Sequence, residues 1–201
     1  MNLKYTLQKF WSFLKEDSWP SLLVSIIIIV IIIKFVFFPL LSFITGSPLP
    51  LVVIESCSMY HPTSFEDWWS QNSALYEERN ITKLVFSEFS FKNGLNKGDI
   101  IFVWGRTEYE PGDIITFLPN PESKSKYPII HRLISLNPAS TKGDNNYVQL
   151  TKNNNLQQTD ETSIPRERIM GKAAFRIPFI GWIKLIFFEP FKDQKTRGFC
   201  K

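Results

Sequence analysis

The chain of 201 residues predicts a mainly β domain that is attached to a membrane by one N-terminal helix. Two observations support this prediction: one long apolar stretch near the N-terminus, and a series of short apolar runs separated by turn residues in the remainder. That remainder, about 150 residues, is enough for one domain with its own hydrophobic core. Short strands at this spacing favour a sandwich or a partly closed barrel over an alternating α/β fold.

The long apolar stretch covers residues 22–44. At 1.5 Å per residue, a helix of this length crosses a hydrocarbon core of about 30 Å. Lys34 interrupts the stretch, and at the bilayer centre it would cost roughly 2.5–3.5 kcal/mol. We therefore expect its ammonium group to reach outward, beside the phenylalanines that follow it, and we expect Pro39 to end or kink the helix. The stretch is too long for a cleaved signal peptide, and no small-residue cleavage pattern follows it directly, so it predicts a retained anchor.

The charges on either side of the anchor predict its orientation. Residues 1–21 carry three lysines, whereas residues 45–62 carry one glutamate and neither lysine nor arginine. Because positively charged flanks stay in the cytoplasm, we expect a single-pass protein of the cell membrane with a cytoplasmic N-terminus and an extracytoplasmic domain. Asn80 begins an Asn-Ile-Thr triplet, an acceptor pattern for glycosylation that would be accessible on that side.

The strand predictions follow from apolar runs bounded by Gly, Pro, Asn and Asp. Two of these runs open with Gly-Asp and continue into β-branched and aromatic residues. The predicted strands cover residues 49–56, 98–105, 112–119, 127–136, 147–152 and 170–181. Ser64 opens a Ser-Phe-Glu-Asp sequence that resembles a capping box, which predicts a helix running to about Glu78.

Two segments depart from the β pattern. Residues 64–96 form a partly helical insertion whose aromatic residues have helical spacing, so we expect them to pack; a lid or a partner-binding insertion is the alternative. The apolar, aromatic tract 177–191 is too short to span a membrane, and it predicts either an interfacial segment lying on the membrane or a buried strand and turn. The chain is thus divided into a cytoplasmic tail (1–21), the anchor (22–44), a β-rich domain (45–181) and a membrane-proximal C-terminal segment (182–201).

The composition argues against several classes of site. The net charge is +4 and the basic residues are scattered, so we expect no nucleic-acid partner. We find no cluster with the spacing of metal ligands and expect neither a metal nor another cofactor. Cys57 and Cys200 could pair once in an oxidising exterior. We expect Cys57 instead to behave as a small buried apolar residue.

The tetrapeptide Ser-Cys-Ser-Met at 56–59, called the Ser box below, lies shortly beyond the anchor. In an extended segment Ser56 and Ser58 share one face. A serine hydroxyl is a poor nucleophile until a base removes its proton, and that base needs a pKa near the working pH. His61 lies beside a proline, in a loop too constrained to hold it against Ser58. His131, within an apolar predicted strand, is the remaining histidine and the candidate base.

Four further motifs follow the Ser box in order. They are Lys-Gly-Asp-Ile at 97–100, Pro-Gly-Asp-Ile at 111–114, Pro-Ile-Ile-His-Arg at 128–132, and Ile-Met-Gly-Lys at 169–172 with Ile-Pro-Phe-Ile-Gly at 177–181. In this order the five elements resemble the type I signal peptidases, and specifically their archaeal and endoplasmic-reticulum branch. The resemblance extends over most of the chain and implies a signal-peptidase-like β catalytic domain.

The resemblance also implies roles for individual residues. Ser58 would attack the scissile carbonyl, His131 would take its proton, and the hydroxyl of Ser56 would help to hold the oxyanion. The third member in this branch is an acidic residue that follows a Thr-Lys-Gly-Asp-Asn-Asn turn. We assign it to Asp160, whose spacing from the closing strands fits. The literal copy of the turn motif contains Asp144, the alternative acid, but comes one strand too early, and we interpret it as a hairpin turn.

The implied function is that of a membrane-anchored serine endopeptidase, a type I signal peptidase that removes signal peptides from secreted and membrane precursors. The expected partners are these signal peptides and the lipid bilayer, with the translocation machinery as a further candidate. A second hypothesis is a catalytically inactive, membrane-anchored subunit that keeps the fold for binding or assembly. A self-processing peptidase of the repressor type is disfavoured, because that class uses lysine as its base and generally lacks an anchor.

Overall fold

The structure is a computed structural model that describes residues 3–201. The chain divides between Ile44 and Thr45 into two compact units. The helical elements at the N-terminal end are α1 (Leu3–Leu14), α2 (Trp19–Ile32), the π-helical turn η1 (Ile33–Phe37) and α3 (Phe38–Thr45). The last three form one apolar helix of 27 residues, Trp19–Thr45, which is long and apolar enough to cross a membrane by length and composition.

The long helix continues past Pro39 instead of ending there. Its N-terminus is capped by Ser18, whose side chain accepts a hydrogen bond from the backbone N–H of Ser21. Because Pro39 has no N–H to donate, the regular hydrogen-bond ladder cannot pass through it. The π-helical turn lies just before this point, with the N–H of Phe38 bonded to the carbonyl of Ile33. The proline thus coincides with a local irregularity and not with a helix end.

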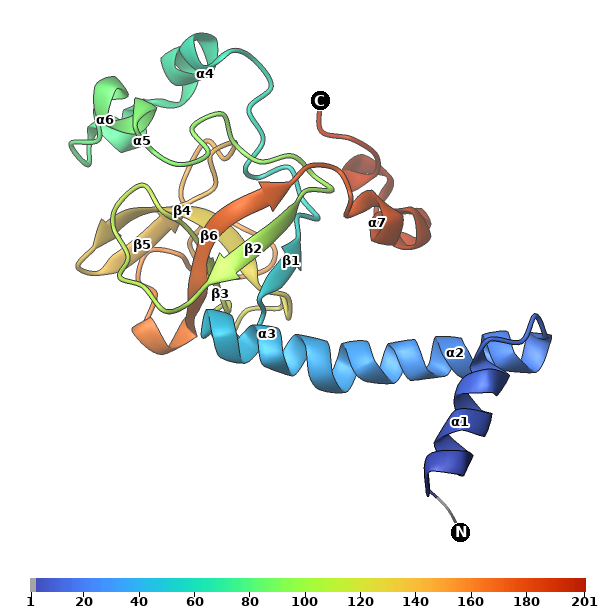
Figure 1. Ribbon diagram of the computed structural model, residues 1–201. Helices are drawn as coiled ribbons and strands as arrows, with labels where there is room; N and C mark the ends of the chain where they lie inside the picture. Colours follow the sequence, from blue (N-terminus) through green and yellow to red (C-terminus); the bar gives the residue numbers. More distant parts are fainter. Residues whose placement is uncertain (1–2) are drawn as a thin grey trace. The chain divides into compact units, whose positions relative to one another are not determined.

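The second unit is built on a six-stranded antiparallel sheet (Figure 1). The strand order is β1-β2-β6-β3-β4-β5, so β6 from near the C-terminus pairs between β2 and β3. The strands are β1 (Leu51–Val53), β2 (Ile100–Trp104), β3 (Ile114–Phe117), β4 (Ile129–Leu136), β5 (Ala139–Lys142) and β6 (Ile169–Ile177). This arrangement confirms the predicted mainly β fold.

Five of the six predicted strand segments contain a strand, and one prediction is wrong. Residues 147–152 form no strand, whereas β5 forms at 139–142, in a region interpreted as a turn. The chain reverses at Asn137-Pro138, so that Ala139 pairs at once with Leu136 of β4. The carbonyl of Thr141 on β5 accepts a hydrogen bond from the side chain of Gln149 at 2.8 Å. Residues 147–152 thus contact β5 through a side chain and not as a paired strand.

The sheet is covered on both sides at β3. Successive side chains of a strand point to opposite faces. Ile114 belongs to an apolar cluster with Ile101 and Val103 of β2, whereas Ile115 belongs to a different cluster with Leu133 of β4. All four residues of β3 are buried. The middle of the sheet is therefore interior, and chemical groups carried by its neighbour β4 lie inside the domain.

The insertion at 64–96 carries three short helices, which gather on one side of the sheet in Figure 1: α4 (Phe65–Asn72), α5 (Ala74–Glu77) and α6 (Lys83–Ser87). Ser64 caps α4 as predicted, because its hydroxyl accepts from the backbone N–H of Asp67. The single helix predicted to reach Glu78 is interrupted at Ser73. The aromatic residues pack as expected, in a cluster that contains Trp68, Trp69, Tyr76 and Phe86.

The C-terminal tract forms helix α7 (Trp182–Phe188), not a buried strand and turn. Leu185 faces the domain, whereas Ile183, Ile186 and Phe187 are exposed. Three 3₁₀ turns complete the described elements: η2 (Arg166–Arg168), η3 (Glu189–Phe191) and η4 (Gln194–Thr196).

The packing of the insertion yields a stability prediction. Phe86 is fully buried among the aromatic rings of the insertion, whereas Leu84 on the same helix is 75% exposed. We expect Phe86→Ala to lower the free energy of unfolding by about 3–5 kcal/mol, because it leaves a cavity. The matched control Leu84→Ala should change it by less than about 0.5 kcal/mol. Denaturant unfolding of the detergent-solubilised protein measures both, and equal losses would show that the cluster is not a core.

Candidate active site

The Ser box lies in a turn that follows β1. The N–H of Tyr60 donates to the carbonyl of Cys57 at 3.1 Å and closes the turn. Met59 holds it in place, because its side chain is buried in the core and its carbonyl accepts from the N–H of Leu95 at 2.7 Å. The hydroxyls of Ser56 and Ser58 lie 3.1 Å apart and share a hydrogen bond. The structure thus brings these two predicted site residues together.

His131 lies on β4, opposite Ile115 of β3, and is buried. Its Nδ1 is hydrogen-bonded to Oε2 of Glu161. In a neutral imidazole whose Nδ1–H donates to this carboxylate, Nε2 is the acceptor. A Cβ atom built on Gly143 would lie 2.8 Å from Nε2 of His131 and 2.9 Å from the carbonyl oxygen of Ser58. Nε2 of His131 and the carbonyl oxygen of Ser58 therefore border the same point beside Gly143, which places this nitrogen near the backbone of the Ser box.

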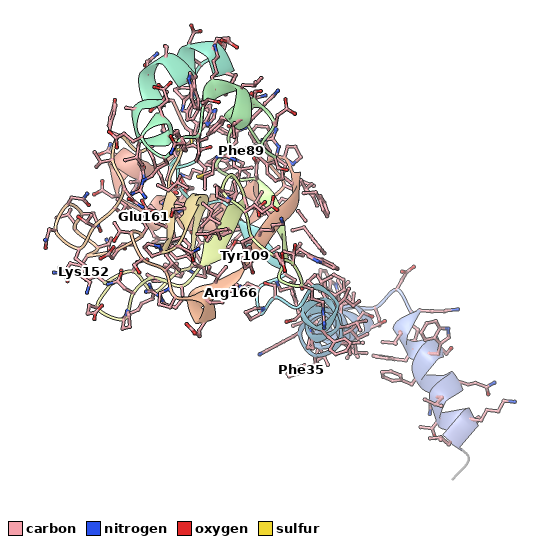
Figure 2. The ribbon with its side chains drawn as sticks, turned by 90° about the vertical axis from the view of Figure 1, so that its left-hand side faces the viewer. Phe35, Phe89, Tyr109, Lys152, Glu161 and Arg166 are labelled. Carbon is pink, nitrogen blue, oxygen red and sulfur yellow. A yellow bond between two sulfur atoms is a disulfide. The ribbon has the colours of Figure 1, made fainter. Side chains whose placement is uncertain are left out.

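The acid that contacts His131 is Glu161, not Asp160. Glu161 is fully buried inside the second unit (Figure 2), and its carboxylate also accepts from the hydroxyl of Thr141 at 3.0 Å and from the N–H of Leu150 at 2.7 Å. The carboxylate of Asp160 instead accepts from the N–H and the hydroxyl of Thr162, at 3.0 and 2.7 Å. The two neighbouring acids are engaged in different interactions, and the histidine lies beside Glu161.

Asp144 does not contact His131 either, but its carboxylate is the centre of a second buried network. It accepts from Nε and Nη2 of Arg132 at 3.0 and 2.7 Å, and from the hydroxyl of Tyr76 at 2.8 Å. Nε2 of His61 lies 3.1 Å from Oδ2 of Asp144, the oxygen that Nη2 of Arg132 also contacts. The Thr-Lys-Gly-Asp-Asn-Asn motif overlaps the end of β5, and residues 143–168 form no strand that could pair with β5, so the interpretation as a hairpin turn was wrong.

The Asp144 network has a defined charge state. Burial alone would raise the pKa of the Asp144 carboxyl, but the charge of Arg132 and the hydrogen bonds from His61 and Arg132 outweigh it and hold this pKa well below its usual range. Burial and the negative charge of Asp144 raise the pKa of Tyr76, so that its phenol stays a neutral donor. Burial lowers the pKa of Lys142, the last residue of β5, to about 8.

Residues 143–145, called the contact loop below, connect this network to the Ser box. The N–H of Asn145 donates to the carbonyl of Ser58 at 2.8 Å, and the Asn145 side chain donates to the carbonyl of Cys57 at 3.1 Å. Asp144, between Gly143 and Asn145, is held by Arg132. The Arg132–Asp144 ion pair therefore fixes the contact loop, which in turn donates hydrogen bonds to the backbone of the Ser box.

The insertion supports the same network from outside. Nη1 and Nη2 of Arg132 donate to the carbonyls of Ser90 and Phe91, at 3.1 and 3.0 Å. The ring of His61 stacks on that of Trp68, with centroids 3.7 Å apart. The sequence reasoning missed Glu161 and Arg132; the Arg that directly follows the candidate base was the available signal for the second.

Cys57 is not a free apolar residue, and that expectation was wrong. It forms a disulfide with Cys200, 143 residues further along the chain. Because Cys57 stands between Ser56 and Ser58, the Ser box is covalently joined to the C-terminal end.

We expect Asp144→Asn to destabilise the protein by about 3–5 kcal/mol, because it leaves the Arg132 charge buried without its partner. A carboxyl with a lowered pKa contributes stability above its unfolded value of ~4, and this contribution is lost as the pH falls below it. The difference from wild type should therefore shrink in acid, as measured by unfolding at pH 7 and at successively lower pH. The half-buried Asp160 supplies the control, Asp160→Asn; a larger loss there would contradict the assignment.

No protein-family model matches the chain. It is 28% identical over 159 residues, 75% of this chain and 88% of that protein, to the signal peptidase complex catalytic subunit of Sclerotinia sclerotiorum. The corresponding subunit of Verticillium alfalfae is 27% identical over 158 residues, 74% of this chain and 70% of that protein. That of Komagataella phaffii is 26% identical over 153 residues, 69% and 84% of the two chains. The chain is therefore a homologue of signal peptidase complex catalytic subunits, which are members of the type I signal peptidase family.

Proposed function

We propose that this chain is a membrane-anchored serine endopeptidase that removes N-terminal signal peptides from secreted and membrane precursors. One observation carries the proposal most directly. A buried imidazole is bonded through Nδ1 to a carboxylate, and its Nε2 lies near the backbone of a serine-containing turn. This is the arrangement in which a nucleophile has a base and the base has an orienting acid. The homologues, named as catalytic subunits, support the same activity.

In the proposed mechanism the hydroxyl of Ser58 attacks the scissile carbonyl while Nε2 of His131 takes its proton. Glu161 keeps Nδ1 protonated and stabilises the imidazolium that forms. His131 then gives the proton to the leaving amine, and it activates a water molecule that hydrolyses the acyl-enzyme. No hydrogen bond joins Ser58 to His131 in the described residues 3–201. Such catalytic contacts often tighten only when substrate is bound.

Ser56 is proposed as a donor to the oxyanion. Its hydroxyl lies 3.1 Å from that of Ser58, so it is close to the carbonyl that Ser58 would attack. A donor aimed at the developing negative charge stabilises an acyl-transfer transition state by about 2.7–4 kcal/mol. The hydroxyl–hydroxyl contact would be replaced by the contact to the substrate oxygen.

The substrate proposal follows from the anchor and the sheet. A serine held near a membrane by one helix can reach peptide bonds in chains that emerge at the same surface, as signal-peptide precursors do. β1 is an edge strand of the sheet and runs into the Ser box. An extended peptide could therefore add to this edge and deliver its carbonyl to Ser58. We propose a cytoplasmic N-terminus and an extracytoplasmic catalytic unit in the cell membrane, with the translocation machinery as a candidate partner.

We expect Ser58→Ala, His131→Ala and Glu161→Gln each to lower the cleavage rate of a model secretory precursor by roughly 10³-fold or more. Glu161→Gln acts by removing the charge that stabilises the imidazolium. Asp160→Asn, the adjacent acid, is the matched control and should cleave at nearly the wild-type rate. The measurement uses detergent-solubilised full-length protein.

Each deviation from this pattern has a definite meaning. Unchanged cleavage by Ser58→Ala would overturn the mechanism. A wild type that binds the precursor without cutting it would favour the inactive binding subunit. Loss of cleavage in Asp160→Asn with survival in Glu161→Gln would return the acid to Asp160.

Gly143 provides an independent test of the geometry. An added methyl group would overlap Nδ2 of Asn146, Nε2 of His131 and the carbonyl of Ser58, so these groups must shift. We expect Gly143→Ala to lower kcat by about 10²-fold, since small misplacements of reacting groups cost that much. The thermal unfolding midpoint of the same variant is the control, and a variant that is folded and fully active would show that His131 does not lie beside the Ser box during catalysis.

A further inference from the structure

The C-terminal segment from residue 182 to residue 200, called the strap below, is joined to the Ser box by a covalent bond. Cys200 near its end forms the disulfide with Cys57. Cys57 is the residue between Ser56 and Ser58, the proposed oxyanion donor and nucleophile. A constraint on Cys57 is therefore a constraint on the backbone of both serines.

A second contact joins the strap to the residue just before the Ser box. The carboxylate of Glu55 pairs with Nζ of Lys184 at 2.7 Å and with Nζ of Lys192 at 3.5 Å. Residues 55 and 57 are thus held by the strap, whereas Ser56 and Ser58 bond to each other. The contacts alternate along the chain. The strap therefore holds the Ser box without occupying the serine hydroxyls.

The strap is itself fastened to the domain. Lys97 is buried, and its Nζ donates to Glu189 at 2.8 Å and to the carbonyl of Thr196 at 2.7 Å. The N–H of Gly198 also donates to Glu189, at 2.8 Å. Trp182 donates from its ring nitrogen to the carbonyl of Lys97 at 3.0 Å. These contacts fix the position of the strap on the domain, so the disulfide restrains Cys57 relative to the domain.

The disulfide is the stronger of the two links to the Ser box. The Glu55 side chain is 42% exposed, and ion pairs that are open to solvent contribute little because water and salt screen them. A covalent bond is not screened. The part of the strap that governs the position of the serines is thus the bond between Cys57 and Cys200.

We infer that the strap is a positioning element for the nucleophile, in which the Cys57–Cys200 disulfide holds Ser56 and Ser58 in the geometry needed for attack. This inference rests on the proposed peptidase function. Its consequence is a difference between binding and turnover. With the disulfide open, the sheet, the insertion and the His131–Glu161 pair keep their own contacts, so precursor still binds while the acylation step slows.

The test compares kcat and KM of four full-length samples: oxidised wild type, wild type treated with a dithiol, reoxidised wild type, and Cys200→Ser. The dithiol breaks the S–S bond, leaves two thiols and is itself oxidised to a disulfide. Cys200→Ser leaves the Ser box sequence unchanged. We expect kcat to fall by about 10- to 100-fold in the reduced and variant samples, with KM changed less than about threefold. Reoxidation should restore wild type.

Two controls make the result specific. Leu156→Ala changes a side chain outside the strap that is 90% exposed and keeps the disulfide, so kcat should stay close to wild type. Dithiol should not change Cys200→Ser further. Equal kcat in all four samples would overturn the inference. So would a loss of activity that follows unfolding, because the disulfide would then be structural only.

Failure of the inference is distinguishable from failure of the proposed function. If oxidised wild type does not cut the precursor faster than Ser58→Ala, the proposed function fails, and the strap has no nucleophile to position. If oxidised wild type cuts and the reduced enzyme cuts equally well, only the role of the strap is contradicted.

Discussion

The buried ion pair of Arg132 and Asp144 is the interaction on which the arrangement of the site depends. Both side chains are completely excluded from solvent. Burying such a pair is expensive, and its attraction offsets the cost only when further hydrogen bonds satisfy both groups. Here backbone carbonyls of the insertion and the phenol of Tyr76 supply those bonds. The pair links β4, the insertion and the contact loop, so a shift of any of the three breaks a hydrogen bond to a buried charge.

In the proposed mechanism, two neighbouring residues of β4 have different roles: one takes part in the chemistry and the other supports the site. His131 contacts Glu161, and its Nε2 lies near the Ser box, whereas Arg132 contacts Asp144 and the insertion. Adjacent strand residues point to opposite faces, so one short segment serves both tasks. The Ser box is divided similarly: Cys57 is bonded to the strap, and Ser56 and Ser58 bond to each other. In both segments, residues proposed to react therefore alternate with residues that hold the backbone in place.

The sequence was sufficient for features set by local pattern and insufficient for those set by distant contacts. The apolar helix and the strands that follow Gly-Asp are predicted by hydropathy and turn residues. Motif order indicated the Ser box and His131 as a site, which stays a prediction. β5 was not predicted because its sequence, Ala-Ser-Thr-Lys, contains no apolar run. This strand forms through its pairing with β4. The Cys57–Cys200 bond joins residues 143 positions apart, and no local pattern distinguishes a paired from an unpaired cysteine at that distance.

The acid beside His131 shows most clearly why residue type alone does not identify a site. The family resemblance pointed to an aspartate, and Asp160 was available one residue away. Asp160 is turned to Thr162, which satisfies its carboxylate locally. Glu161 instead enters the interior, where Thr141 and the backbone of Leu150 hold its carboxylate. A buried carboxylate must find donors for its oxygens. Glu161 finds these donors in Thr141 and Leu150, which lie in segments that the sequence motifs do not bring together.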